Sequence, residues 1–123
     1  MDNSLDAKKV TAINADAMAW KEHPEAKVGK SFFTKMLVQD PETGVQINLL
    51  KYPAGFMTPW HDHPCSHGVY ILEGTLKTNE GSFGPGSFVW FPEGSVAEHG
   101  AALESDVVVL FVTNKKFDIN FIE

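Results

Sequence analysis

Three histidines within a span of seven residues are the side chains in this chain with the clearest chemical use. They are His61, His63 and His67, and a run of β-forming residues follows at 69–72. Side chains two positions apart in an extended segment point to the same face, so His61 and His63 can offer two neutral imidazoles to one ion. His67 reaches the same ion if the loop at 64–66 turns the chain back. The spacing predicts a metal site, and the alternative is a solvated polar loop.

The elements that would position these histidines are short strands separated by glycine and proline turns. Alternation and β-forming content predict strands at 31–38, 45–52, 69–72, 75–78, 87–91, 106–113 and 117–122. No stretch has a helical period, and residues 1–30 have the least pattern, with one or two edge strands among loops. This succession predicts an all-β sandwich or barrel.

Length and composition are typical of one soluble domain that covers residues 1–123. Of these residues 43% are hydrophobic, which is enough for a core. The formal charge of −6 argues against nucleic acid and anionic membrane surfaces as partners. The start of the chain has no signal-peptide pattern, and no eighteen consecutive residues are apolar. A single cysteine, Cys65, excludes an internal disulfide, and we expect a cytoplasmic protein.

Two further polar residues have both a functional and a structural interpretation. Lys35 stands between Phe33 and Leu37 on one face of a predicted strand. If that face lines a cavity, Lys35 binds a substrate carboxylate; if it faces out, the lysine stem covers apolar surface and the ammonium reaches water. His23 lies beside Pro24 among charged residues, and we expect it to be exposed and without a function.

The histidine stretch resembles the first signature of the cupin superfamily. That signature has glycine, five residues, His-x-His, three or four residues, glutamate, six residues and glycine. Gly55, His61, His63 and Gly74 fall at these spacings, and His67 occupies the glutamate position. The match is specific because the spacings agree in order, in a chain that independently shows a β pattern.

A later stretch resembles the second cupin signature, which has glycine, five residues, Pro-x-Gly, two residues and histidine. The matching residues are Gly86, Pro92 and Gly94. The histidine position holds Ala97, and the nearest histidine is His99, two residues later. An insertion of two residues preserves strand parity, so His99 can point inward. Glu98 is the competitor for this position, because a bulge would exchange the two faces.

The resemblance implies both a fold and a ligand set. The fold is a single-domain cupin β-barrel of the jelly-roll, double-stranded β-helix type, in which residues 31–113 form the barrel core and carry both signatures. The implied ligands are His61, His63 and His99, with His67 in place of the carboxylate, so the ion has three or four imidazoles. Such a set suits one divalent transition metal, with Fe(II) as the first choice and Zn(II) or Ni(II) next.

Two subfamilies of cupins resemble this chain most. In size and rhythm it is similar to small cupins such as the anti-sigma factor ChrR domain and acetylacetone dioxygenase, through residues 41–44, 53–55 and 70–74. Residues 61–67 and 72–77 locally resemble cysteine dioxygenase-type thiol dioxygenases, which are much longer.

These resemblances imply two classes of function. The first is a mononuclear metal-dependent dioxygenase that acts on a small chelating substrate such as a diketone, enol or thiol. The alternative is a non-catalytic metal-binding or ligand-sensing module. Dimerisation through sheet edges is common in cupins, so we expect a homodimer in either case.

Overall fold

Strands account for almost all regular structure in the computed structural model, which describes residues 8–121. The largest sheet has six antiparallel strands in the spatial order β1-β2-β3-β10-β5-β8. In that order they are β1 (Lys21–Glu25), β2 (Lys30–Gln39), β3 (Gln46–Tyr52), β10 (Val107–Thr113), β5 (His67–Glu73) and β8 (Phe88–Phe91). One 3-10 turn, η1 (Ala15–Ala17), precedes them, and the described residues contain no α-helix.

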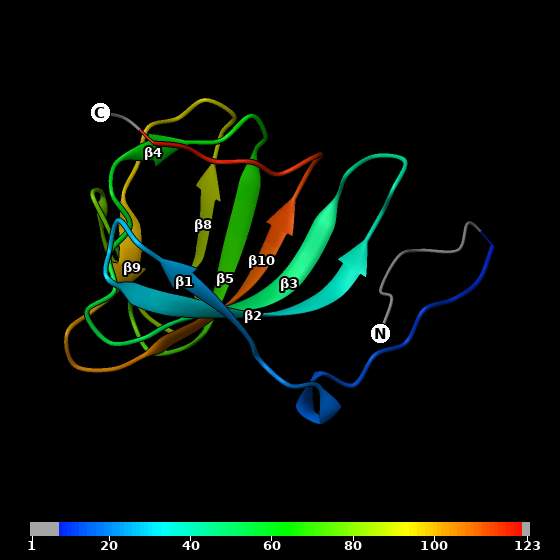
Figure 1. Ribbon diagram of the computed structural model, residues 1–123, viewed down its shortest axis with the longest axis horizontal. Helices are drawn as coiled ribbons and strands as arrows, with labels where there is room; N and C mark the ends of the chain where they lie inside the picture. Colours follow the sequence, from blue (N-terminus) through cyan, green and yellow to red (C-terminus); the bar gives the residue numbers. More distant parts are fainter. Residues whose placement is uncertain (1–7, 122–123) are drawn as a thin grey trace.

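Two smaller sheets complete the architecture. The three-stranded sheet contains β7 (Gly81–Phe83), β6 (Leu76–Thr78) and β9 (His99–Ala101), and the two-stranded sheet pairs β4 (His61–Asp62) with β11 (Asn120–Phe121). An isolated bridge between His61 and Ala97 connects β4 to the segment before β9. The large sheet curves toward β4 and β9, and together they enclose the interior of a barrel (Figure 1). The predicted all-β architecture is therefore confirmed.

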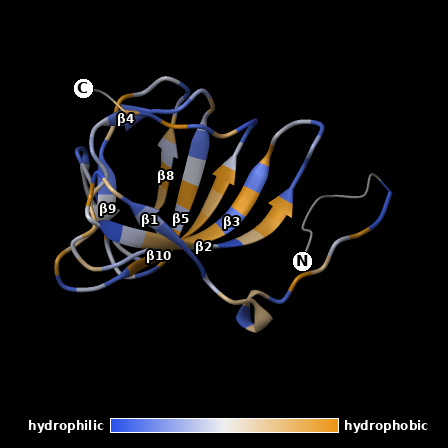
Figure 2. Ribbon diagram, viewed as in Figure 1, coloured by the Kyte–Doolittle hydropathy of each residue, from blue (hydrophilic) through white to orange (hydrophobic). Residues whose placement is uncertain are grey.

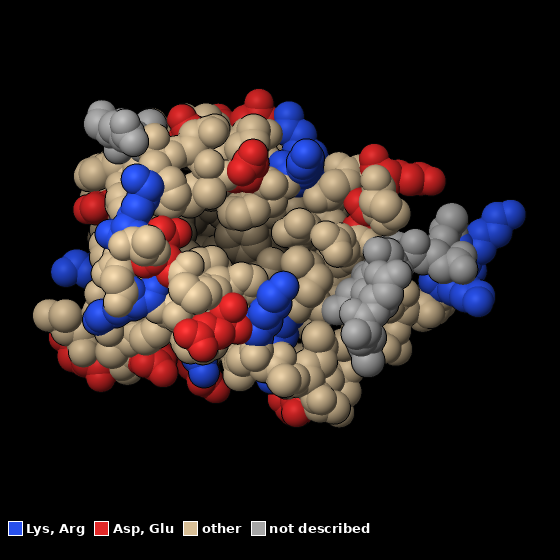
Figure 3. Space-filling view, viewed as in Figure 1, with Lys and Arg blue, Asp and Glu red and all other residues tan. Residues whose placement is uncertain are grey.

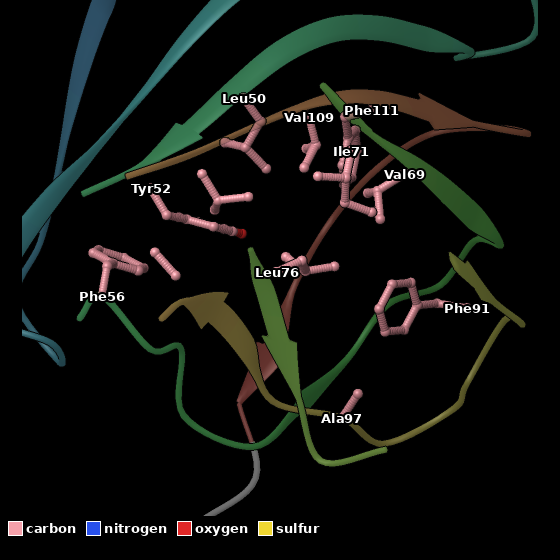
Figure 4. Close-up of a cluster of buried hydrophobic side chains, with 12 residues drawn as sticks. Leu50, Tyr52, Phe56, Val69, Ile71, Leu76, Phe91, Ala97, Val109 and Phe111 are labelled. Carbon is pink, nitrogen blue, oxygen red and sulfur yellow. The ribbon is translucent and has the colours of Figure 1, made fainter. Parts of the chain in front are cut away.

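The core lies inside this barrel because the strands alternate between inward and outward side chains. In β10, Val107, Val109 and Phe111 are buried, while the residues between them are half-buried. Hydrophobic residues run along β2, β3, β5 and β10, and the connections are more hydrophilic (Figure 2). Figure 4 shows the core side chains pointing into the enclosed space, with the Tyr52 hydroxyl among them.

Gly100, next to His99, allows two segments of the chain to approach each other closely. A Cβ atom at this position would overlap the carbonyl oxygen of Phe56. The neighbouring Ala101 N–H donates to that same oxygen at 2.8 Å. The approach brings Thr58 beside His99, and the Thr58 N–H donates to the His99 carbonyl at 2.9 Å. The backbone contact at a glycine therefore determines where His99 stands.

The predicted strands between residues 31 and 113 are confirmed, with ends that differ by one or two residues. For residues 1–30 one or two edge strands were predicted, and β1 lies there at the edge of the large sheet; residues 1–7 lie outside the described part. The strand predicted at 117–122 was wrong in extent, because only β11 is a strand there and residue 122 is not described. Within residues 8–121, no helix has the length and apolarity needed to cross a membrane.

Candidate metal centre

The four histidines predicted as ligands all point into the barrel. His61, His67 and His99 are the first residues of β4, β5 and β9, and His63 directly follows β4. Their exposed fractions lie between 1% and 7%. Glu98, the competitor of His99, is only partly buried and lies between two buried residues. The structure thus places the histidine inward at this position, as strand parity predicts.

Three of these histidines form a compact group. The candidate ligand atoms of His61, His63 and His99 lie within 4.8 Å of one another. The Nε2 atoms of His61 and His99 are 3.1 Å apart, and the ring centroids of His61 and His63 are 4.8 Å apart. Nitrogen donors of this type and spacing have the composition of a site for a divalent transition metal.

The second ring nitrogen of each of these histidines already has an oxygen partner. Nδ1 of His61 lies 2.7 Å from the carbonyl oxygen of Pro59, and Nδ1 of His63 contacts the carbonyl oxygen of Asp118. A carbonyl oxygen only accepts, so both Nδ1 atoms carry the proton and both Nε2 atoms keep a lone pair. Nδ1 of His99 lies 3.1 Å from a hydroxyl, that of Tyr52. All three contacts orient the rings, and the two carbonyls also select the tautomer of His61 and His63 in which Nε2 is free to ligate.

His67 differs from the other three histidines in its surroundings. Its ring lies 4.7 Å from the ring of His63, and it stacks against Phe91 at 4.6 Å and against Phe111 at 5.0 Å. Neither of its nitrogens has a hydrogen-bond partner among residues 8–121, although both are buried. Most buried polar groups in folded proteins are hydrogen-bonded, so these two atoms are unusual.

Burial lowers the pKa of all four histidines. Desolvation is the largest cause at each, and neighbouring histidines lower the pKa of His63, His67 and His99 further. The pKa of His67 falls to about 3, and the pKa of His99 lies well below its usual value. At His61 the Pro59 carbonyl partly opposes the effect of burial on the pKa. The four imidazoles are therefore uncharged at neutral pH, which is the form that ligates a metal.

A cavity of about 290 Å³ opens beside the three clustered histidines. Figure 3 shows a hollow in one face of the molecule, with charged residues around it. Its apolar lining residues are Phe32, Met36, Leu50, Phe56, Phe111, Phe117, Ile119 and Phe121. Its polar lining residues are His23, Glu25, Thr34, Gln46, Asn48, Tyr52, Thr58, His61, His63 and His99. Most of the cavity surface is nevertheless apolar, and the three clustered histidines border a chamber that can admit a small molecule.

Residues 8–118 match a protein family described as the ChrR cupin-like domain, which covers most of the chain. The chain belongs to the ChrR-like cupin family. A comparison with the curated proteins finds no match. The predicted membership of the cupin superfamily, and the similarity to ChrR-type small cupins within it, are therefore confirmed.

Solved structures similar to this ChrR-like cupin show the same fold. A candidate acetylacetone dioxygenase from Methylibium petroleiphilum PM1 is 17% identical, with 97% of this chain and 85% of that chain covered and a TM-score of 0.78. An RmlC-like cupin protein from Ralstonia eutropha JMP134 is 24% identical, with 93% and 78% covered and a TM-score of 0.72. The predicted cupin barrel is confirmed by these matches, and at such identities they show the fold alone.

A third similar structure is a complex of two proteins. It is that of Rhodobacter sphaeroides SigE with the anti-sigma ChrR, and the matched chain is 19% identical with a TM-score of 0.65. The match covers 81% of this ChrR-like cupin but only 51% of the other chain. About half of that chain therefore has no counterpart here.

Sequence reasoning missed the oxygen groups that hold the imidazoles of this cupin. Tyr52 had a usable signal, because alternation in the strand at 45–52 puts it on one face with Asn48 and Leu50. The carbonyl of Asp118 had none, since a backbone group is the same in every residue. Its position depends on the segment before β11, where Phe117 packs against His63 with ring centroids 4.7 Å apart.

The Lys35 side chain lies away from the clustered histidines. Its ammonium donates to the Ala15 carbonyl at 2.8 Å and lies 4.7 Å from the ring centroid of Trp20. It stands between Thr34 and Met36 in β2, which line the cavity, whereas Lys35 does not. The lysine therefore lies on the outer face of β2, and the contact with a substrate carboxylate stays an untested prediction.

His23 was predicted to be an exposed residue, and this prediction was wrong. The ring is partly buried, its Nε2 lies 2.7 Å from Thr34 Oγ1, and it stacks on Phe32 at 4.9 Å. It also lines the cavity, together with Glu25 from the same edge strand. Its charged neighbours Lys21 and Glu22 are exposed, but pairing of β1 with β2 turns the His23 side chain toward Phe32 and Thr34.

Proposed function

We propose that this cupin is a mononuclear metal-dependent dioxygenase that acts on a small chelating organic molecule such as a diketone, enol or thiol. The proposed ligands are His61, His63, His67 and His99. The observation that carries the proposal is that three of these buried, neutral imidazoles, those of His61, His63 and His99, meet at the wall of a cavity large enough for a small molecule. The fold alone does not distinguish an enzyme from a binding module, so the argument depends on this site.

The surroundings of His67 support its inclusion among the ligands. Its two unpartnered nitrogens are buried between aromatic rings, and a buried polar atom without a partner costs about 1–3 kcal/mol. An ion bound beside His63 would remove part of this cost. The donor set therefore fits a metal better than it fits a metal-free barrel.

The residues around the ligands have clear tasks in such a site. The carbonyls of Pro59 and Asp118 and the hydroxyl of Tyr52 hold three rings in one orientation. The aromatic lining excludes water from a bound substrate. An iron ion, when bound, supplies Lewis acidity and redox chemistry at this position. An all-imidazole set suits Fe(II), Zn(II) and Ni(II), and a dioxygenase favours Fe(II) among them.

Metal analysis combined with oxygen uptake tests the proposal. We expect about one iron per chain after anaerobic loading, and oxygen uptake with acetylacetone or with a thiol such as cysteine. His61→Ala removes a ligand and should abolish both, whereas His23→Gln, a histidine variant outside the cluster, should keep the metal. Tightly bound zinc, together with no oxygen uptake after the zinc has been exchanged for iron, would contradict the proposed dioxygenase activity.

A second candidate function is a non-catalytic metal-binding or ligand-sensing module. It is supported by the family match and by the similarity to a chain from the SigE–ChrR complex. The cavity lining supports it as well. Among the described residues that line the cavity, Glu25 is the one carboxylate, so few acid or base groups face a bound ligand. Ligand binding that changes the thermal unfolding temperature without any product would favour this function over the enzyme.

We also propose that the protein forms a homodimer, and the structure offers an edge for it. β8 is an edge strand of the large sheet, and it exposes Phe88 by 61% and Trp90 by 51%. Large exposed aromatic side chains on a strand edge favour association. Light scattering should give twice the chain mass, and Trp90→Lys should reduce it to one.

A further inference from the structure

The inner face of β3 carries a carboxamide that has no partner. Asn48 lies on the same face as Leu50 and Tyr52, is 6% exposed, and lines the cavity. Its side chain forms no hydrogen bond with any residue between 8 and 121. The amide faces the cavity and has no protein partner, so its donor and its acceptor are both available to a ligand.

The register of the sheet sets the distance between Asn48 and the histidine side of the barrel. It pairs with Phe111 in the β3–β10 register, and the ring of Phe111 stacks on His67 at 5.0 Å. β10 separates β3 from β5, and Phe111 pairs with Val69, so Asn48 lies two strand spacings, about 10 Å, from β5, the strand that begins at His67. A molecule held at the histidines and lying across Phe111 would therefore reach the carboxamide.

The charges around the cavity limit what this distal end of a ligand can be. Among the described residues that line it there is no lysine or arginine, and Glu25 is the one carboxylate. A carboxylate or phosphate would enter this apolar space without a cationic partner, which is unfavourable. A carboxamide both donates and accepts hydrogen bonds, so it suits a hydroxyl or a carbonyl group.

We propose that Asn48 determines specificity by binding an uncharged oxygen function at the far end of a metal-chelating ligand. The inference rests on the proposed function only in that the other end of the ligand is held by the metal. It assigns the substrate class as a chelator that carries an aromatic or aliphatic body and a neutral hydroxyl or carbonyl group. A ligand carboxylate, which Lys35 would bind if its face lined the cavity, is excluded from this class.

Calorimetric titration of the Zn(II)-loaded protein tests this assignment, because zinc leaves the ligand unoxidised. The chelating probes are benzoylacetone and its para-hydroxy and para-carboxy derivatives. We expect the hydroxyl to strengthen binding about 3- to 10-fold, as one hydrogen bond to a buried partner does, and the carboxylate to weaken it. In Asn48→Leu the hydroxyl advantage should vanish, while Asn48→Asp should keep it and reject the carboxylate more strongly.

Matched controls separate this inference from the proposed function. Gln39→Leu replaces an exposed carboxamide outside the cavity, and Lys35→Met replaces the lysine on the outer face of β2; both should bind every probe as the wild type does. A hydroxyl advantage that survives Asn48→Leu, or a loss of para-carboxy binding in Lys35→Met, overturns the inference and leaves the metal site standing.

A second pair of probes covers the case in which no diketone binds. Toluene and p-cresol differ by one hydroxyl and do not chelate, so they report on Asn48 without the metal. If benzoylacetone fails to bind, the proposed function loses its support, and a preference for p-cresol that Asn48→Leu removes still supports the inference. If neither toluene nor p-cresol binds in that case, the inference fails as well.

Discussion

The cavity has two polar walls that are built differently. On the histidine wall, Nδ1 of His61, His63 and His99 is held by an oxygen atom of the protein. On the sheet wall, the side-chain amides of Gln46 and Asn48 form no hydrogen bonds with the described residues. The imidazoles of the first wall are therefore preorganised by the protein. The amides of the second wall can form hydrogen bonds only with a ligand or solvent that enters the cavity.

This difference shows how one small barrel can bind an ion on one wall and a polar group of an organic ligand on the other. Fixed imidazole rings favour an ion of defined coordination, because little reorganisation is needed on binding. Unpartnered carboxamides favour a ligand that supplies its own donor or acceptor. His67 lies outside this wall: it does not line the cavity, it lacks an oxygen partner, and its ring lies near those of Phe91, Phe111 and His63.

Removing a clustered histidine should break the histidine wall altogether. His99→Ala deletes one of the three nitrogen donors that lie within 4.8 Å, and we expect metal affinity to fall more than about 100-fold, beyond the loss caused by a change behind a ligand. Competition with a chromophoric chelator measures the affinity. Asn48→Ala on the sheet wall is the control, and equal losses in both variants would contradict the division between the walls.

Acid should destabilise the histidine wall in the metal-free protein. The folded pKa values lie below the usual value of 6.5, so the unfolded chain binds more protons as the pH falls below 6.5. Between the unfolded pKa of about 6.5 and its own folded pKa, each such histidine lowers the free energy of unfolding by up to about 1.4 kcal/mol per pH unit, and for His67 the loss continues to about pH 3. Urea titrations from pH 7 to pH 4 measure it. A constant free energy of unfolding over this range would refute the buried neutral state.

Substitution of His67 by phenylalanine should separate metal affinity from stability. His67→Phe keeps a ring between Phe91 and Phe111 and removes two unpartnered nitrogens, so the metal-free protein should gain about 1–3 kcal/mol. If His67 ligates, the same change weakens metal binding about 10-fold or more. Chemical denaturation and chelator competition measure the two effects. Unchanged metal affinity would restrict the ligand set to three histidines.

The smallest effect is expected behind the histidine wall. Tyr52→Phe removes the hydroxyl that contacts His99 Nδ1 but keeps the ring stacked on Phe56 at 4.9 Å. Metal affinity should fall about 10-fold with the fold retained, as is typical when a partner of a ligating histidine is lost. Circular dichroism checks the fold, and metal titration checks the affinity. A loss as large as that of His99→Ala would mean that Tyr52 acts on more than the orientation of one ring.

The strand pattern and the two signatures were sufficient to predict the barrel and the approach of its histidines. The ends of β2, β3 and β10 were predicted to within two residues, and in β3 and β10 the alternation reflects one buried face. The two-residue shift from Ala97 to His99 was also resolved by parity, since side chains alternate with a period of two. The orientations of the Lys35 and His23 side chains were harder to predict, because near the edge of a sheet both faces of a strand can be partly covered.

What the sequence by itself determined is therefore the residue types, their order and the face on which each lies. Only the tertiary structure decided which groups meet across the barrel. The Asp118 carbonyl reaches His63 because the chain after β10 crosses back over the cavity, and Gly100 lets His99 approach through a backbone contact. The free carboxamide of Asn48 has the same origin, since no local pattern records that a side chain facing a cavity lacks a protein partner. Such relations join residues far apart in the chain, and local periodicity carries no information about them.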